Sequence, residues 1–248
     1  DAVHTAQFSI GSGTKIAMEG AAALSAALNS HEDVPTALAA YEAARKDEVG
    51  ALQSSAMISL QWYENARRYN NHDPEQYVFN FLARTKGMTY ENLAMRDPGY
   101  VKSVDQWFAN QVREQGFTDI SVNDPPPPMF TPFRLRGMTV PNRVVVSPMC
   151  QFSAEDGLVN NWHMVHLGGF AVGGAGLIYT EMTDVSPEGR ISLGCAGMYK
   201  PEHRDAWAEI VDFVHENSAA KICMQLAHAG RKGSTKLAWE GDNQPLEN

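Results

Sequence analysis

The sequence is poor in cysteine, in basic residues and in long apolar runs. Its three cysteines, Cys150, Cys195 and Cys223, are too few and too scattered for a disulfide framework and form no Cys-x-x-Cys pair, so a reducing, cytoplasmic compartment is expected. The net charge of −9 argues against the basic face that non-specific nucleic-acid binding needs. Since no apolar run approaches the roughly 18–20 residues of a membrane span, no membrane partner is expected.

Proline, by contrast, is concentrated in one place, the seam at residues 123–129, where Pro125 to Pro128 are consecutive. Proline locks φ and donates no N–H, so the seam can be neither helix interior nor central strand, and we expect an extended spacer. Apolar residues repeat at helical spacing before it, whereas β-branched runs alternate with helical ones after it. We therefore predict a helical part at 1–122, a linker at 123–129 and an α/β part at 130–248. A proline-rich loop inside one domain is the alternative.

A glycine-rich turn precedes the first predicted helix. The turn is Gly11-Ser12-Gly13-Thr14, and an alanine-rich stretch with high helix propensity follows it to Asn29. Bare backbone N–H groups at a helix N-terminus form a site for an anion. Gly-x-Gly before a helix also occurs in purely structural turns, so the motif alone leaves both interpretations open.

The wider segment from Asp1 to this turn resembles the second flavin motif of the FAD-dependent aromatic hydroxylases. The resemblance implies that Asp1 holds ribityl or ribose hydroxyls. It also implies that the turn faces the FAD with the backbone groups of Gly11, Ser12, Gly13 and Thr14. Four positions depart from the family pattern: Phe8 replaces proline, Ser12 glutamine, Lys15 asparagine and Gly20 an acidic residue. The family's N-terminal Gly-x-Gly-x-x-Gly segment is missing, so the motif is half of an FAD site.

The rest of the first part is predicted to be a helical arm, with helices at 34–69, 74–84 and 98–115. Asp33 can cap the first of these helices, and Gly50 can interrupt it. One apolar stripe runs along it at spacings of three and four or their sums: Leu38, Tyr41, Val49, Leu52, Ala56, Leu60 and Tyr63. Four basic residues near these helices either meet a phosphate-bearing substrate or form a solvated face: Arg67, Arg68, Arg84 and Lys86.

The second part alternates strands and helices. We predict a hairpin at 130–141, then strands at 142–147, 177–183 and 221–226, with helices at 162–172 and 201–216 between them. Continuously apolar strands separated by helices are typical of parallel sheets that are covered on their faces. The order therefore indicates an α/β fold, either a (β/α) barrel or a doubly wound sheet.

Motifs at the ends of the three strands decide between these folds. The motifs are Ser147-Pro148-Met149-Cys150, Thr180-Glu181-Met182 and Gln225-Leu226-Ala227-His228. Together they resemble the Old Yellow Enzyme family of FMN-dependent ene-reductases, in the branch that has a cysteine after Ser-Pro-Met. The resemblance covers residues 130–240 and implies the first three units of a TIM (β/α)8 barrel, whose sites lie at the strand ends.

The same resemblance assigns roles in FMN binding. Ser147, Pro148 and Met149 line the isoalloxazine, and Cys150 sits near its edge and tunes its potential. Met182 lies beside the flavin, where a small residue is usual, and Gln225 hydrogen-bonds its pyrimidine end. The residues that would anchor the substrate, and the FMN phosphate site, are expected beyond Asn248. Without the resemblance, Cys150 would be interpreted as an inert buried thiol.

Two histidines spaced as His163-x-x-His166 suggest a metal site. No third ligand stands at a plausible spacing, so packing or helix-end hydrogen bonding is predicted instead, and no metal. His228 is expected to lie behind the residues that touch the flavin.

The pairing of the two parts resembles the bifunctional flavoproteins of the 2-aminobenzoyl-CoA monooxygenase/reductase and salicylyl-CoA 5-hydroxylase group. It implies that FAD, NAD(P)H and O2 hydroxylate an aromatic acyl-CoA, and that FMN then reduces the ring, in a longer and dimeric enzyme of which this chain is an internal piece. One alternative is an FMN-dependent ene-reductase whose helical part is a non-catalytic docking arm. The other is a fragment without function.

Overall fold

The computed structural model describes residues 4–241 and 244–246, so Asp1 lies outside the described residues. The chain divides into two compact units, one up to Trp107 and the other from Phe108 onwards. Each unit is considered by itself. Within the described ranges, no helix is both long and apolar enough to cross a membrane.

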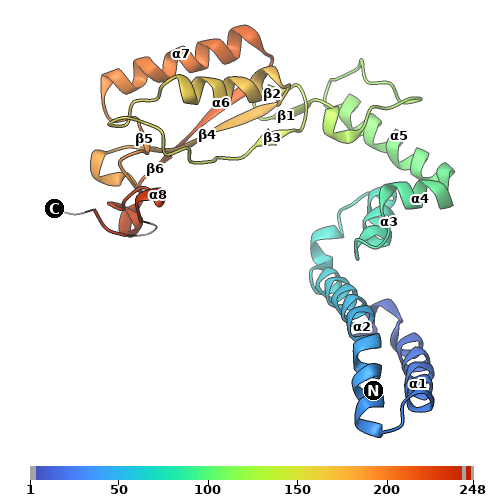
Figure 1. Cartoon of the computed structure of the whole chain (residues 1–248). Helices are drawn as coiled ribbons and strands as arrows, with labels where there is room; N and C mark the ends of the chain where they lie inside the picture. Colours follow the sequence, from blue (N-terminus) through green and yellow to red (C-terminus); the bar gives the residue numbers. More distant parts are fainter. Residues whose placement is uncertain (1–3, 242–243, 247–248) are drawn as a thin grey trace. The chain divides into compact units, whose positions relative to one another are not determined.

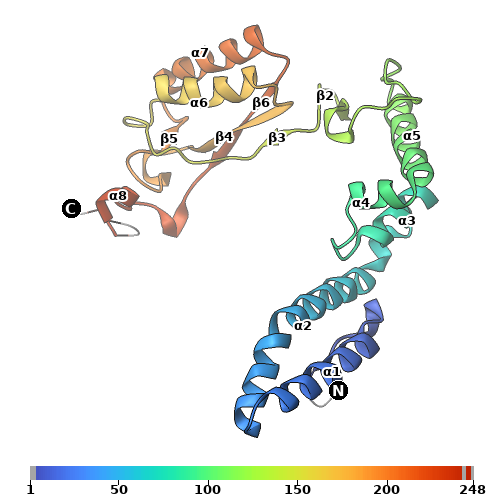
Figure 2. The same ribbon diagram turned by 45° about the vertical axis from the view of Figure 1, so that its right-hand side comes forward.

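The first unit is helical (Figure 1). Its elements are η1 (Phe8–Ile10), α1 (Gly13–Ser30), α2 (Val34–Glu64), η2 (Ala66–Tyr69), α3 (Pro74–Ala83), α4 (Tyr90–Arg96) and most of α5 (Pro98–Glu114). In Figures 1 and 2, α1 and α2 lie side by side as a helical hairpin. The predicted helices are confirmed, except that the one predicted at 34–69 ends at Glu64 and is followed by the separate turn η2; α4 is an additional helix.

Helix α2 begins where the sequence predicts. Asp33 caps it by accepting a hydrogen bond from the backbone N–H of Thr36 at 2.9 Å, and Pro35 occupies the first turn. The helix continues through Gly50 without a break.

The buried stripe of α2 differs in part from the predicted one. Tyr41, Val49 and Ala56 are buried as expected, but Leu38 and Tyr63 are exposed. Their neighbours in the sequence, Ala37 and Trp62, are buried instead, together with Arg45 and Ser59. The long Leu38 side chain lies at the border of the stripe, where the small Ala37 allows closer packing against α1.

The second unit combines a small hairpin with a parallel sheet and covering helices. Its strands are β1 (Phe133–Leu135), β2 (Met138–Val140), β3 (Val145–Val146), β4 (Leu177–Asp184), β5 (Ala196–Gly197) and β6 (Lys221–Ala227). Its helices are α6 (Asn161–Val172), α7 (Pro201–Asn217) and α8 (Ala238–Gly241), with short 3-10 turns η3 (Pro128–Phe130), η4 (Pro187–Gly189) and η5 (Gly230–Lys232). The α/β prediction is confirmed.

Strand β4 is the centre of the sheet. Its first residues, Leu177 and Ile178, pair with β3 on one side and with β6 on the other, both in parallel. Its last residues, Thr183 and Asp184, pair with β5 and β6. Strands β3 and β5 therefore follow each other along one edge of β4, and β6 covers the other edge.

The predicted strand at 142–147 is wrong in its length and burial, because only Val145 and Val146 form a strand and Val145 is about half exposed. The Asn142 side chain donates to the carbonyl oxygen of Gly174 and accepts from the N–H of Val144, so it caps the segment instead of extending the ladder. At the other end, Pro148 has no N–H to continue the pairing.

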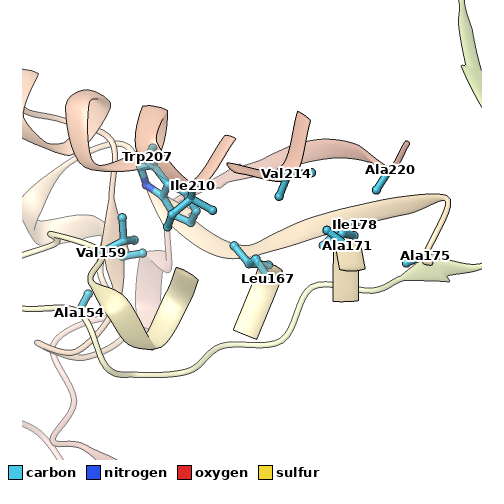
Figure 3. Packing of buried hydrophobic residues seen from close by; sticks show 11 residues of the cluster. Ala154, Val159, Leu167, Ala171, Ala175, Ile178, Trp207, Ile210, Val214 and Ala220 are labelled. Carbon is cyan, nitrogen blue, oxygen red and sulfur yellow. The ribbon is translucent and has the colours of Figure 1, made fainter. Parts of the chain in front are cut away.

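The core of the second unit lies between the sheet and helices α6 and α7 (Figure 3). Ile178 of β4 contributes from the sheet, Leu167 and Ala171 from α6, and Trp207 and Val214 from α7. Trp207 also donates its Nε1–H to the carbonyl oxygen of Gly197 at 3.2 Å. This core fixes β4, whose end carries the candidate site.

The proline seam belongs to the second unit. Pro127 has the extended φ and ψ of −51° and 138°, as predicted, but Pro128 already starts η3. The Arg143 guanidinium lies 5.0 Å from the ring centroid of Phe108 and 4.8 Å from that of Phe133, and burial lowers its pKa. The end of α5 and the hairpin of β1 and β2 are thus joined through one cation–π cluster.

Candidate functional site

Three parallel strands bring their carboxyl ends to one edge of the sheet. The segment after β3 carries Ser147 to Cys150, β4 carries Met182, and β6 carries Gln225. In parallel sheets with helices between the strands, ligands bind outside the carboxyl ends of the strands. The six residues predicted for FMN therefore lie on one side of this unit, although their contacts with FMN stay a prediction.

The segment after β3 is tied directly to β4. The backbone N–H of Gln151 donates to Oε2 of Glu181 at 3.2 Å, and the Gln151 side chain donates to the carbonyl oxygen of Met149. Trp162, at the start of α6, donates its Nε1–H to Oε1 of Gln151 at 3.1 Å. These bonds hold the exposed Met149 in place beside the strand end.

Cys150 is half-buried next to β4. Burial raises the pKa of its thiol, the nearby carboxylates of Glu181 and Asp184 raise it further, and a hydrogen bond from the backbone N–H of Met182 opposes both effects. The thiol is therefore neutral at physiological pH, a weak dipole in contact with the Met182 backbone. A neutral thiol beside a flavin would tune its electronics without acting as a nucleophile.

Met182 and Gln225 are partners in the register between β4 and β6. The ladder shifts between Tyr179 and Met182, where the N–H of Gln225 donates to Oγ1 of Thr180 instead of to a carbonyl oxygen. The Gln225 side chain is exposed, and its amide has no hydrogen-bond partner among the described residues. An unoccupied amide beside an apolar methionine suits the polar edge and the ring of a flavin.

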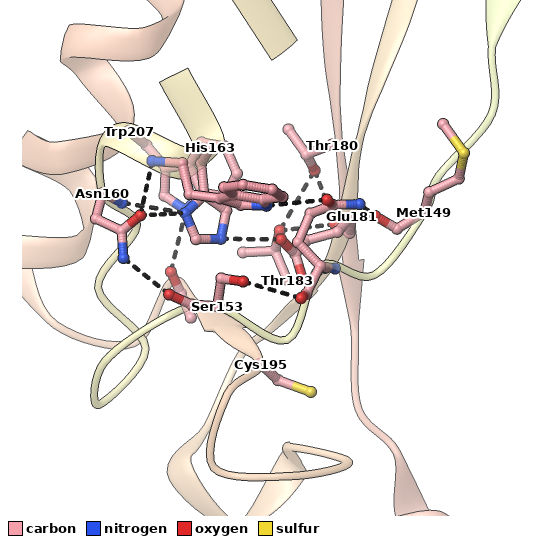
Figure 4. Close-up of polar contacts among 12 residues, drawn as sticks. Met149, Ser153, Asn160, His163, Thr180, Glu181, Thr183, Cys195 and Trp207 are labelled. Carbon is pink, nitrogen blue, oxygen red and sulfur yellow. Dashed lines mark hydrogen bonds and ion pairs between the residues drawn. The ribbon is translucent and has the colours of Figure 1, made fainter. Parts of the chain in front are cut away.

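A buried polar cluster supports the site from behind (Figure 4). His163 is 1% exposed, and its two ring nitrogens have different neighbours: Nδ1 accepts the backbone N–H of Asn160, and the other nitrogen, Nε2, faces Glu181. That nitrogen lies 3.0 Å from Oε1 of Glu181, a close contact that is poorly aligned as a hydrogen bond. Asn160 accepts from Trp162 N–H and completes the capping box of α6.

Asp184 ends β4 as a fully buried carboxylate. Neither of its oxygens has a hydrogen-bond partner among the described residues. Burial raises its pKa to about 6, against the opposing charges of His228 and Arg190 and with support from Glu181. The strand alternation places it on the face of β4 that also carries Met182.

Replacing Asp184 by asparagine is expected to stabilise the unit at neutral and higher pH. The folded-state pKa lies above the 3.8 of the unfolded chain, so the protonated acid contributes stability that is lost as the pH rises through about 6. Asp184→Asn escapes this loss, and should gain about 2–3 kcal/mol over the wild type near pH 8 but only about 1 kcal/mol near pH 4.5. Urea unfolding at the two pH values measures the difference, and an equal gain at both would contradict the assignment.

The glycine-rich turn of the first unit has the geometry of a helix start. Gly11 has a φ of 67°, which favours glycine, and α1 begins at Gly13 after Ser12. Ser12 is buried, and its Oγ has no partner among the described residues. Gly13 and Thr14 open the helix with free N–H groups. The FAD role of these four residues stays a prediction, and Asp1 lies outside the described residues.

The remaining histidines have structural contacts. His166 meets Phe170 edge to face at 5.0 Å, and burial lowers its pKa. Nδ1 of His228 accepts the N–H of Gly230. Among residues 4–241 and 244–246, no three His, Cys, Asp or Glu side chains gather in a way that could hold a metal ion.

Sequence reasoning missed two of the residues that shape this site. The sequence places Glu181 in the Thr-Glu-Met motif but assigns it no role. In the structure it contacts both the segment after β3, through Gln151, and α6, through His163. Asp184 was not singled out. The one available signal was an acidic residue at the end of a predicted parallel strand, where a buried carboxylate is rare unless the group is paired or functional.

The second unit matches a known family. Residues 128–245 match the model of the NADH:flavin oxidoreductase / NADH oxidase family. This match supports the flavoprotein resemblance predicted for residues 130–240. It includes no residue of the helical first unit, where the hydroxylase resemblance stays a prediction.

Individual relatives cover the same share of the chain. An NADPH dehydrogenase of Geobacillus sp. (strain WCH70) is 49% identical over 106 residues, which make up 42% of this chain and 31% of that protein. An NADH:flavin oxidoreductase of Gibberella zeae is 42% identical over 111 residues, 45% of this chain and 27% of that protein. The chain therefore spans about a third or less of the length of these relatives.

Solved structures of the same kind also align. Morphinone reductase aligns with 31% identity and a TM-score of 0.40 over 43% of this chain and 28% of that one. The old yellow enzyme from Trypanosoma cruzi aligns with 32% identity and a TM-score of 0.40, also over 43% of this chain and 28% of that one.

Proposed function

We propose that the second unit is the opening part of an FMN-dependent oxidoreductase that takes electrons from NAD(P)H and reduces an electron-poor carbon–carbon double bond. The observation that carries the proposal is the family match over residues 128–245 together with three strand ends that meet at one edge. The relatives are an NADPH dehydrogenase and an NADH:flavin oxidoreductase by name, which supports a nicotinamide nucleotide as the reductant.

The residues present fit a flavin. Gln225 offers an unoccupied amide for the pyrimidine end, and Met149 and Met182 offer apolar contact for the ring system. Ser147 and Pro148 would line the ring from the segment after β3, and Cys150 would lie at its edge. Bound FMN supplies hydride transfer, and the protein contributes position and electrostatics.

The segment that carries Met149 and Cys150 is held by the cluster behind it. Glu181 accepts the N–H of Gln151 and thereby fixes the backbone beside Cys150, and Nε2 of His163 lies 3.0 Å from the other carboxylate oxygen. The neutral thiol adds no charge near the flavin, so it would modulate the potential weakly and leave hydride transfer to the flavin itself.

The test is NADPH oxidation by the full-length polypeptide that contains this chain, with cyclohex-2-enone as acceptor. We expect enone-dependent oxidation of NADPH and saturation of the enzyme with FMN. Gln225→Leu should weaken FMN binding about tenfold, because the hydrogen bond proposed between its side-chain amide and the flavin is lost, while Gln244→Leu, which replaces an exposed glutamine outside the site, should not. Absence of FMN-dependent NADPH oxidation would contradict the proposal.

A second candidate function extends the first to two flavins. The glycine-rich turn at the start of α1, with Gly11 in a left-handed conformation, favours an FAD site in the first unit. In that case NAD(P)H, FAD and O2 would hydroxylate an aromatic acyl-CoA and FMN would reduce its ring. An ene-reductase with a helical docking arm is the simpler alternative. A cytoplasmic location and a dimer stay predictions.

A further inference from the structure

A small pocket in the first unit has a positively charged lining. It has a volume of about 240 Å³ and lies where the end of α2, the turn η2 and the end of α3 meet. Its lining contains no carboxylate. The polar lining residues are two arginines and two carboxamides, Arg68, Arg84, Gln61 and Asn65, and the aromatic ones are Trp62 and Tyr69.

Arg84 is held in a fixed orientation by uncharged groups. Its Nε donates to Oγ of Ser59 at 3.0 Å, and its Nη1 and Nη2 donate to the carbonyl oxygens of Phe81 at 2.7 Å and Ser9 at 3.4 Å. Its guanidinium also lies 4.1 Å from the ring centroid of Phe81. Three of its five N–H groups are used in this way, and two remain for a ligand.

Neither arginine of the pocket has an acidic partner. In the part of the chain that the structure describes, no carboxylate lies within 4.0 Å of the cationic nitrogens of Arg68 or Arg84. Arg84 is partly buried, and such charges are normally paired, so its preorganised guanidinium without a counter-charge is a site for an anion, to which the exposed Arg68 adds a second positive charge. The chain as a whole carries a charge of −9, which makes a cationic pocket a local exception.

The floor of the pocket is rigid. Tyr69 stacks on Trp62 with a centroid distance of 4.9 Å and an interplanar angle of 8°, and Arg68 lies 5.7 Å from the Tyr69 centroid. Trp62 is fixed in turn by the bond from its Nε1–H to Oδ1 of Asn80 at 2.6 Å. The rings present an apolar wall, so an organic anion has both a charged and an apolar surface to contact.

We propose that this pocket binds an oxyanion, the phosphate or carboxylate group of a small organic ligand, between the guanidinium groups of Arg68 and Arg84. Planar guanidinium groups match both oxyanions with paired N–H donors. A volume of about 240 Å³ is smaller than the ~300–1,000 Å³ of typical whole-ligand sites, so the pocket would take the anionic end of its ligand. The proposal does not depend on flavin chemistry in the second unit.

The test is calorimetric titration of the whole chain, at constant ionic strength, with inorganic phosphate, adenosine 5′-monophosphate, adenosine and benzoate. We expect saturable binding of at least one anion. Binding of phosphate and the nucleotide identifies a phosphate-bearing ligand, and binding of benzoate alone identifies a carboxylate. Adenosine, which carries no charge, should not bind. If it binds as tightly as its monophosphate, or if no anion binds, the proposal is wrong.

Variants locate the binding to this pocket. Arg68→Gln changes an exposed side chain, so the fold should persist while the affinity for the anion falls about tenfold. Arg84→Lys keeps the charge but loses the paired donors and should also weaken binding. Arg67→Gln is the matched control, since Arg67 lies on η2 outside the pocket lining, and its effect should stay within about twofold. Equal weakening by Arg67→Gln and Arg68→Gln would indicate diffuse attraction and overturn the proposal.

Discussion

Removing Glu181 should destabilise the second unit by about 3 kcal/mol, because Glu181→Ala leaves the backbone N–H of Gln151 without its acceptor and opens a cavity in the buried cluster. The Glu181 side chain is almost fully buried and faces two groups, Nε2 of His163 at 3.0 Å and the backbone N–H of Gln151 at 3.2 Å. Without the carboxylate, the N–H of Gln151 loses its acceptor, and Nε2 of His163 loses its close contact with Oε1. The segment that carries Cys150 would then detach from β4.

The measurement is the urea midpoint of the second unit, followed by circular dichroism. Glu209→Ala removes an exposed glutamate from α7 and should change the free energy of unfolding by at most about 0.5 kcal/mol. Glu181→Gln keeps an acceptor oxygen, so its loss in the free energy of unfolding should lie between those of Glu181→Ala and Glu209→Ala. Equal stability of Glu181→Ala and the wild type would show that the cluster does not hold the strand end.

Replacing Trp207 by alanine should cost about 3–5 kcal/mol, the usual range for an aromatic side chain in a core. Trp207 is 2% exposed and packs from α7 against the sheet. The replacement also removes the hydrogen bond from Nε1 to the carbonyl oxygen of Gly197, which belongs to β5. Because the ring of His163 lies 6.5 Å away, the loss of Trp207 should also loosen the cluster behind the candidate site.

Trp239→Ala is the matched control, since its side chain is 68% exposed. It should leave the urea midpoint unchanged, whereas Trp207→Ala should lower it and reduce the near-ultraviolet circular dichroism of the folded state. If both variants unfold at the same urea concentration, the core described between α7 and the sheet is wrong.

The fold could be predicted where local patterns are strong. Apolar residues at helical spacing, with Asp33 as a cap, were enough to predict α2. Apolar runs between the helices were enough to predict β4 and β6. The motif residues Cys150, Met182 and Gln225 could be predicted to meet because parallel strands end at one edge of a sheet. The family match bears out the flavoprotein resemblance of this part.

The predictions that failed concern features that depend on contacts between residues far apart in the sequence. The strand predicted at 142–147 shortens because Asn142 bonds to Gly174, 32 residues away, and no local pattern reports that bond. The rotated stripe of α2 depends on how closely α1 approaches Ala37. The burial of the unpaired Asp184 carboxylate depends on the folded surroundings of the strand end, and residue propensity carries no information about burial of this kind.

The measurement that tests the central claim most directly is the flavin content of the full-length polypeptide, by acid extraction and chromatography. If the second unit is the first part of an FMN-binding barrel, the full-length polypeptide should contain close to one FMN per chain. An equal amount of FAD would in addition support the second candidate function, and FMN alone would leave the helical unit as a docking arm. A well-folded polypeptide that retains no FMN, even after incubation with the free cofactor, would contradict the account.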